Sequence, residues 1–330
     1  MDILIAGIFI LAIIVLANIL QVRNRRFEKL LFDGALLILS AAVFFLGLAF
    51  FLLPSELFQN LDGAALELLD TQAYGLVLLL TSVAAIAFAI KPVRRLLAAV
   101  MPLDPSSPVH SLALVLSAYA LGYTGLTLSQ GGLTQMAESA IPAPLPFVIG
   151  SSLLFALIGV FGVGFIIRRR GRDLLARLGL EKPTPAQIVV AFAAIVVLVV
   201  LQACVGLIWQ FMNPDQFEVL DDVSSTLLMD IDTVWEWLLL ALAVGIGEEL
   251  LFRGAIQPAF GLGYTSILFA LIHVQYGLTP ITLTVLIIAI VLGVMRRYYS
   301  TTITIIVHAG YDLTLGLLAL LAAYLQQFVT

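Results

Sequence analysis

Long apolar runs constrain the fold of this chain more than any other feature. A membrane-spanning helix needs about 20 predominantly apolar residues, and about ten runs approach or exceed that length. They cover residues 2–22, 31–53, 72–90, 109–128, 145–167, 186–211, 234–253, 264–279, 280–295 and 303–326. The eighth and ninth runs are short and separated only by GLTP, so they can be half-spans or a tight hairpin. Since 62% of the residues are hydrophobic and only 11% are charged, we predict an all-α, polytopic membrane helix bundle.

The basic residues predict the orientation. If the ten spans alternate in direction across the membrane, all 16 lysine and arginine residues fall at junctions on one side. Loops 54–71 and 212–233, on the other side, are acidic. The positive-inside rule then places the basic loops in the cytoplasm and both termini outside. The first run lacks a basic n-region and an A-x-A-like cleavage site, so we read it as an anchor helix. We expect a multi-pass protein of a prokaryotic plasma (inner) membrane, with the lipid bilayer and no nucleic acid as partner.

The distribution of ionisable residues predicts two bundles. Residues 1–167 would form an N-terminal five-helix membrane bundle, whose spans carry ionisable side chains only near their ends, at Asp33 and His110. Residues 168–185 would be a basic cytoplasmic linker, and residues 186–330 a C-terminal functional bundle with charged groups inside its helices. The single cysteine, Cys204, excludes an intrachain disulfide and is interpreted as a small apolar core residue.

Three short patterns in the C-terminal bundle carry these charged groups. They are Glu248-Glu249-x-x-x-Arg253, Phe269-x-x-x-His273 and His308-x-x-x-Asp312. On a helix, residues four apart share a face, so Glu249 and Arg253 can pair while Glu248 points elsewhere. By the same spacing, Phe269 can wall the imidazole of His273. Asp312 can accept a hydrogen bond from the imidazole of His308.

The predicted topology brings the three patterns to similar depths beneath the cytoplasmic face. At 1.5 Å per residue, Glu248 and His308 lie about 7 Å, and His273 about 13 Å, from the cytoplasmic ends of their helices. Each pattern alone can be structural, as an ion pair or an interhelical hydrogen bond. A second carboxylate beside a paired one, at the depth of two histidines, instead indicates a reaction centre.

A carboxylate with imidazoles in a partly dry pocket suits the activation of water. Desolvation makes a glutamate a better general base, and an imidazole can stabilise the oxyanion formed when water attacks a peptide carbonyl. The chain has no G-x-S-x-G elbow, no H-E-x-x-H zinc helix and no P-loop. Whether the cofactor is Zn²⁺ or none stays open, because His273, His308 and a carboxylate (Glu249 or Asp312) could supply three zinc ligands. We favour Asp312 as a group that orients His308.

The three motifs, in this order on successive hydrophobic helices, resemble the CPBP family of CAAX prenyl endopeptidases and bacteriocin-processing (Abi) intramembrane proteases. The resemblance covers about residues 234–326. It implies that Glu248 activates water with help from His273, that His308 and Asp312 form the oxyanion site, and that Glu249, Arg253 and Phe269 support the site. Prenyl-protein-processing members carry asparagine where this chain has Asp312, which weakens the case for a prenylated CAAX substrate. The family is also widely labelled metalloprotease.

The predicted function is therefore an intramembrane endopeptidase, glutamate- or metal-dependent, that hydrolyses a membrane-associated or lipid-modified peptide or protein near the cytoplasmic face. One alternative is a secondary transporter with a Glu/His proton relay, although transporters usually share such sites between two repeated halves. Another is a non-catalytic immunity or scaffold protein that keeps the pocket for binding.

The orientation can be tested by labelling single cysteines from outside, in a background from which Cys204 has been removed. Loops 23–30, 91–108 and 168–185 should stay unlabelled because the basic residues hold them in the cytoplasm. Loops 54–71 and 212–233 should be labelled. Strong labelling near Arg170 from outside would reverse the orientation.

Overall fold

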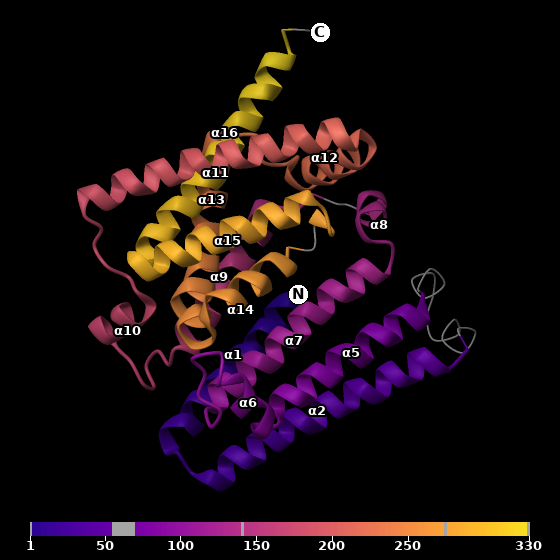
Figure 1. Cartoon of the computed structure of the whole chain (residues 1–330), viewed down its shortest axis with the longest axis vertical. Coiled ribbons are helices and arrows are strands. Elements are labelled where there is room, and N and C mark those ends of the chain that lie inside the picture. Colours follow the sequence, from indigo (N-terminus) through magenta and orange to yellow (C-terminus); the bar gives the residue numbers. More distant parts are fainter. Residues whose placement is uncertain (1, 55–69, 140–141, 274–275, 329–330) are drawn as a thin grey trace. The chain divides into compact units, whose positions relative to one another are not determined.

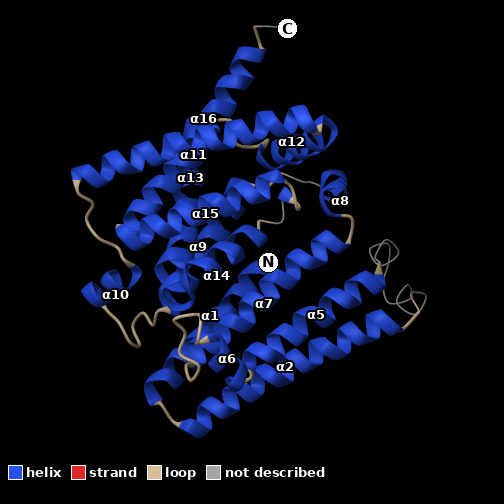
Figure 2. Ribbon diagram, in the orientation of Figure 1, coloured by secondary structure: helices blue, strands red, loops and turns tan. Residues whose placement is uncertain are grey.

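The computed structural model describes residues 2–54, 70–139, 142–273 and 276–328, and these are almost entirely helical (Figures 1 and 2). The one β-pairing in the described residues is an isolated bridge between Phe165 and Arg169. The helices are α1 (Asp2–Arg23), α2 (Arg26–Leu52), α5 (Thr71–Ala89), α6 (Lys91–Leu97), α7 (Pro108–Ser129), α8 (Gly132–Ser139), α9 (Leu145–Gly162), α10 (Gly171–Leu178), α11 (Pro185–Met212), α12 (Pro214–Leu228), α13 (Val234–Glu249), the π-helix η1 (Leu250–Ile256), α14 (Gln257–Leu271), α15 (Pro280–Tyr298) and α16 (Thr301–Gln326). The all-α prediction is confirmed.

Eight of the described helices are long and apolar enough to cross a membrane. They are α1, α2, α5, α7, α9, α11, α15 and α16. The seventh predicted span is also helical, but it is built from α13 and η1 in one continuous segment. Most of the predicted outer loop 54–71 lies outside the described residues. The chain is thus an integral, multi-pass membrane protein.

The eighth predicted run, 264–279, is not a full span. Helix α14 ends at Leu271 and is interrupted at Gly261, whose φ of 84° and ψ of 170° no helix contains. Glycine permits this left-handed backbone without a Cβ clash, and the remaining helix is too short for a bilayer of about 30 Å. The half-span alternative therefore holds for the eighth run, whereas the ninth is the full-length helix α15.

The described residues form two compact units. One contains residues 16–138 and 271–277, and the other contains residues 1–15, 139–270 and 278–330. This division differs from the predicted split at 168–185 because α9 packs with the C-terminal helices. A Cβ at Gly159 of α9 would lie only 2.9 Å from the carbonyl oxygen of Leu250 in η1.

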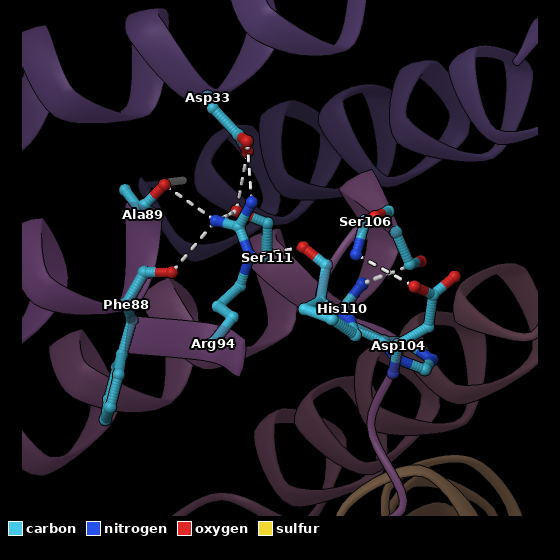
Figure 3. Close-up of polar contacts among 10 residues, drawn as sticks. Asp33, Phe88, Ala89, Arg94, Asp104, Ser106, His110 and Ser111 are labelled. Atoms are coloured by element: carbon cyan, nitrogen blue, oxygen red, sulfur yellow. Dashed lines mark hydrogen bonds and ion pairs between the residues drawn. The ribbon is translucent and has the colours of Figure 1, made fainter. Parts of the chain in front are cut away.

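In the unit of residues 16–138 and 271–277, a buried arginine joins the ends of three helices. Arg94 of α6 is 1% exposed, and its guanidinium donates to Asp33 of α2 at 2.6 Å and to Ser111 of α7 at 2.7 Å (Figure 3). It also donates to the backbone carbonyls of Phe88, Ala89 and Pro105. Every nitrogen of this guanidinium is thus engaged, which identifies a structural junction.

His110 has a local role beside this junction. Its Nδ1 accepts a hydrogen bond of 2.9 Å from the backbone N–H of Asp104 (Figure 3). The Asp104 carboxylate in turn accepts from the N–H of Ser106. The imidazole therefore helps to hold the turn before α7.

In the unit of residues 1–15, 139–270 and 278–330, glycines let α13 pack closely against α9 and α16. A Cβ at Gly245 would lie 2.9 Å from the backbone nitrogen of Ala309 in α16, and one at Gly247 would collide with Ser152 of α9. Thr233 and Glu236 start α13 with a capping box, in which each side chain accepts from the other residue's backbone N–H. These contacts set the depth and rotation of α13, and with them the direction of its last residues.

Cys204 lies on α11 in the same unit, and its side chain is exposed. Its interpretation as a core residue is therefore wrong. On a membrane-spanning helix, an apolar residue is stable facing lipid as well as inside the bundle, so apolar character alone does not predict burial within the protein.

The basic segment 168–185 is packed and partly helical, since it contains α10. Leu178 lies in an apolar cluster with Val163 and Leu250. The carbonyl oxygens of Leu178 and Gly179 accept hydrogen bonds from the hydroxyl and the backbone N–H of Thr301, at 2.6 and 2.9 Å. The predicted linker is therefore fixed to both η1 and the start of α16.

Replacing Gly159 by alanine should test the approach of α9 to η1. The added Cβ would press on the backbone of η1, and overpacking of this kind costs about 1–3 kcal/mol. We expect a lower Tm for Gly159→Ala in thermal unfolding of the purified protein. Gly150→Ala is the matched control in the same helix, because its Cβ would meet nothing within 4 Å and alanine favours helix. Equal Tm values for the two variants would contradict this packing.

Candidate functional site

The charged and imidazole side chains of two of the sequence motifs gather where α13 ends, around the helices η1, α14 and α16. We call this group the Glu249 cluster. It contains Glu248, Glu249, Arg253, Phe269, His308 and Asp312. All six were singled out in the sequence, and all six lie in one compact unit.

Glu249 is the centre of the cluster. Its side chain is fully buried, and Oε1 lies 3.1 Å from a terminal nitrogen of Arg253, itself 1% exposed. The same oxygen lies 2.9 Å from Nδ1 of His308. The predicted Glu249–Arg253 pair is therefore confirmed, whereas the contact between Glu249 and His308 was not predicted. Sequence spacing gives no sign of it, because the two residues lie on different helices.

The contact with Glu249 assigns the tautomer of His308. A carboxylate held by an arginine can only accept hydrogen bonds, so Nδ1 of His308 must carry the proton between them. Nε2 then faces the other side of the cluster, 3.6 Å from Oδ2 of Asp312 and 4.0 Å from Oε2 of Glu248. We predicted that Asp312 accepts a hydrogen bond from His308, but 3.6 Å is an ionic contact beyond hydrogen-bond length.

The three carboxylates differ in exposure. The side chain of Glu249 is 0% exposed, that of Glu248 14% and that of Asp312 19%. Glu248 and Asp312 thus lie on the more open side of the imidazole, next to Nε2, while Glu249 lies behind it at Nδ1. The more exposed part of Glu248 is not its Oε2 atom, which faces Nε2 of His308 and is buried.

Phe269 packs on His308 and Arg253. Its ring meets the imidazole of His308 edge-on, with centroids 6.1 Å apart, and Cζ of Arg253 lies 4.4 Å from the centre of the ring. The ring of Phe252 also packs edge-on against it, at 5.0 Å. The contact of Phe269 with His308 was not predicted, and its role as a wall for His273 stays a prediction.

His273 lies in the other compact unit, just after the end of α14. Its ring stacks on that of Tyr276, with centroids 6.2 Å apart and planes 4° apart. Its assistance to Glu248 remains a prediction from the family resemblance.

The backbone changes from an α-helix to a π-helix at the Glu248–Glu249 motif. Glu249 is the last residue of α13, and the next seven residues form the π-helix η1. Within η1, Arg253 donates to the carbonyl oxygen of Ala289, and one turn later Gln257 donates to that of Gly293 at 2.7 Å. Both acceptors lie on α15. Short π segments are frequent at functional sites, and here two polar side chains anchor one to a neighbouring helix.

The side chains that could hold a metal do not form a set of ligands. Within the described residues, no group of three or more His, Cys, Asp or Glu side chains is arranged to bind a metal ion. Of the four proposed ligands, Glu249 is the one whose contacts argue against a metal role, because its Oε1 is held by both His308 and Arg253. A buried carboxylate paired with a guanidinium and an imidazole does not fit the role of a zinc ligand.

One segment of the chain also matches a known family. Residues 230–314 match the family model described as type II CAAX prenyl endopeptidase Rce1-like. This match supports the assignment of the segment to the CPBP (CAAX protease) family. The matched segment contains every residue of the Glu249 cluster, while the N-terminal helices lie outside it. No curated protein and no solved structure matches the chain.

The dependence of Glu249 on Arg253 gives a stability prediction. Arg253→Met would leave a buried carboxylate without its guanidinium, and loss of one partner of a buried pair costs about 3–5 kcal/mol. We expect a large fall in Tm, measured by thermal unfolding in detergent. The double variant Glu249→Gln/Arg253→Met should regain much of the lost Tm, because the glutamine amide oxygen can still accept a hydrogen bond from His308.

Arg297→Met is the matched control, since Arg297 is exposed at the end of α15. It should change Tm little. A double variant no more stable than Arg253→Met would show that the two side chains are not coupled through charge.

Proposed function

We propose that this protein is an intramembrane endopeptidase in which Glu248 activates water to hydrolyse a peptide bond. The observation that carries the proposal is the asymmetry of the two adjacent glutamates. Glu249 is buried and engaged by Arg253 and His308. Glu248 is partly exposed and lies beside the opposite nitrogen of the same imidazole. This asymmetry supports a positioning role for Glu249 and a chemical role for Glu248.

The proposed reaction begins with a water molecule at Glu248. The carboxylate takes a proton from water as the water oxygen bonds to the peptide carbonyl carbon. The carbonyl oxygen becomes an oxyanion, which Nε2 of protonated His308 stabilises by donating a hydrogen bond. The C–N bond then breaks, and the leaving amine receives the proton from Glu248. The products are a carboxylic acid and an amine.

Glu249 and Arg253 act in this scheme as positioning residues. Glu249 holds Nδ1 of His308, so that Nε2 is directed at the open side of the cluster. Arg253 keeps Glu249 ionised in a buried position, and Phe269 fixes the plane of the imidazole from its edge. Asp312 lies beside Nε2 and would orient the imidazolium when it donates to the oxyanion.

The substrate class follows from the location of the site. All four acidic and imidazole groups belong to apolar helices, so a substrate must reach them from the bilayer or its surface. We propose a membrane-associated or lipid-modified peptide or protein, cleaved near the cytoplasmic face of a prokaryotic plasma membrane. The matching family is described as a prenyl endopeptidase, whereas Asp312 weakens the case for a prenylated substrate, so prenylated and unprenylated peptides are both candidates.

Glu248→Gln tests the general base. The variant keeps the shape of the side chain but cannot accept the proton, and general-base help is worth about 10²–10⁴-fold. We expect a fall of that size in the cleavage of fluorogenic peptides, prenylated and unprenylated, by protein reconstituted in liposomes. Tm should be unchanged, since Glu248 does not organise the cluster.

Glu218→Gln is the matched control, because Glu218 is exposed on α12 and its substitution should leave cleavage intact. Near-normal cleavage by Glu248→Gln would end the proposed role of Glu248. Activity that is lost on chelation and restored by zinc would replace the scheme with a metal-dependent one.

A further inference from the structure

Two arginines from different segments contact the backbone of η1, and two more lie in the loop after α9 near the first of them. We call them the arginine cluster: Arg168 and Arg169 from the loop after α9, Arg177 from α10 and Arg296 from the end of α15. None of these side chains takes part in the proposed hydrolysis, so their role is independent of it.

Two of the arginines hold three successive carbonyls. Arg177 donates to the carbonyl oxygens of Gly254 and Ala255 at 2.6 and 3.2 Å. Nε of Arg296 donates to that of Arg253 at 3.3 Å. The guanidinium of Arg296 also lies directly against Gly179, two residues after Arg177, where a Cβ would collide with it. The two cations are therefore brought close together by backbone contacts.

The other two arginines add positive charge beside Arg177. The guanidinium of Arg169 donates to the carbonyl oxygen of Val163, whose side chain packs with Leu178 of α10 and Leu250 of η1. Burial and the neighbouring cations of Arg169, Arg296 and Arg168 lower the pKa of Arg177 to about 10. Burial and the cation of Arg169 likewise lower the pKa of Arg168. Glu181 supplies a negative charge near Arg296, and α10 carries one exposed acid, Asp173. The four cations thus repel one another, and a bound anion would relieve that repulsion.

Apolar side chains are exposed next to these cations. Ile166 is 51% exposed and Leu175 of α10 is 45% exposed. Ile166 has a φ of +66°, which is a strained conformation for a β-branched residue. Its backbone N–H donates to the carbonyl oxygen of Arg169 at 3.0 Å, and its own carbonyl oxygen accepts from Nε of Arg170 at 3.1 Å. These hydrogen bonds therefore hold Ile166 in a conformation in which its side chain is exposed next to the arginines.

Basic and apolar side chains exposed together are typical of surfaces that lie at the boundary of headgroups and acyl chains. We propose that the arginine cluster binds the phosphate-bearing headgroup of an anionic phospholipid, with Ile166 and Leu175 against the adjoining acyl chain. Phosphate oxygens match the guanidinium groups in charge and geometry. Because Arg177 and Arg296 also hold the carbonyls of η1, the bound lipid stabilises the helix that carries Arg253.

The test is native mass spectrometry of the delipidated full-length protein, titrated with phosphatidylglycerol or with phosphatidylcholine of the same acyl chains. Wild type should retain phosphatidylglycerol in clear preference. Each interfacial arginine contributes about fivefold to such binding, so Arg169→Gln/Arg296→Gln should lose roughly 25-fold. Arg25→Gln/Arg26→Gln removes the same charge from an exposed basic loop and should retain the wild-type affinity.

Three results would overturn the proposal. One is equal retention of the two lipids by wild type, and another is equal loss in both double variants. The third is complete displacement by millimolar inorganic phosphate, which would indicate a site for free phosphate instead. If Arg169→Gln/Arg296→Gln does not fold, Arg168→Gln decides, because Arg168 is the most exposed of the four arginines. It should lose about fivefold, and unchanged phosphatidylglycerol affinity would then contradict the proposal.

Discussion

The Glu249 carboxylate is the interaction on which the rest of the site depends. A buried charge is costly unless it is paired and hydrogen-bonded, and Glu249 satisfies this through Arg253 on its own helical segment and His308 on α16. The pairing fixes two helices relative to each other and assigns the proton on Nδ1 of His308. With Nδ1 bound to Glu249, it is Nε2 of His308 that faces Glu248 and Asp312. The proposed role of Glu248 depends on this orientation of the imidazole.

The Glu249 cluster requires that α13 pack closely against its neighbouring helices and that the helix change from α to π after Glu249. Glycines let α13 come within contact distance of α9 and α16, a device common among membrane helices, where small residues replace the hydrophobic effect as the basis of packing. The π-helix η1 then directs Arg253 and Gln257 to carbonyls on α15. The arginine cluster holds other carbonyls of η1, so two sets of contacts anchor this segment.

Much of the architecture could be predicted from composition and spacing. Apolar length predicts helices in a membrane because every backbone polar group must be satisfied inside the segment, and eight predicted spans coincide with long apolar helices. The Glu249–Arg253 pair follows from a spacing of four residues. The short eighth run could not be assigned in advance, since hydropathy does not reveal the break at Gly261 or the helix end at Leu271.

The sequence by itself determined that the chain is a polytopic helical protein, and which residue types carry its chemistry, because both properties depend on local composition and helical periodicity. Only the tertiary structure decided which of those residues meet. It joins Glu249 to His308 and Phe269 to His308, and it packs α9 with the C-terminal helices. Contacts between helices depend on their rotation and depth, which are set by close packing at glycines that no one-dimensional pattern distinguishes.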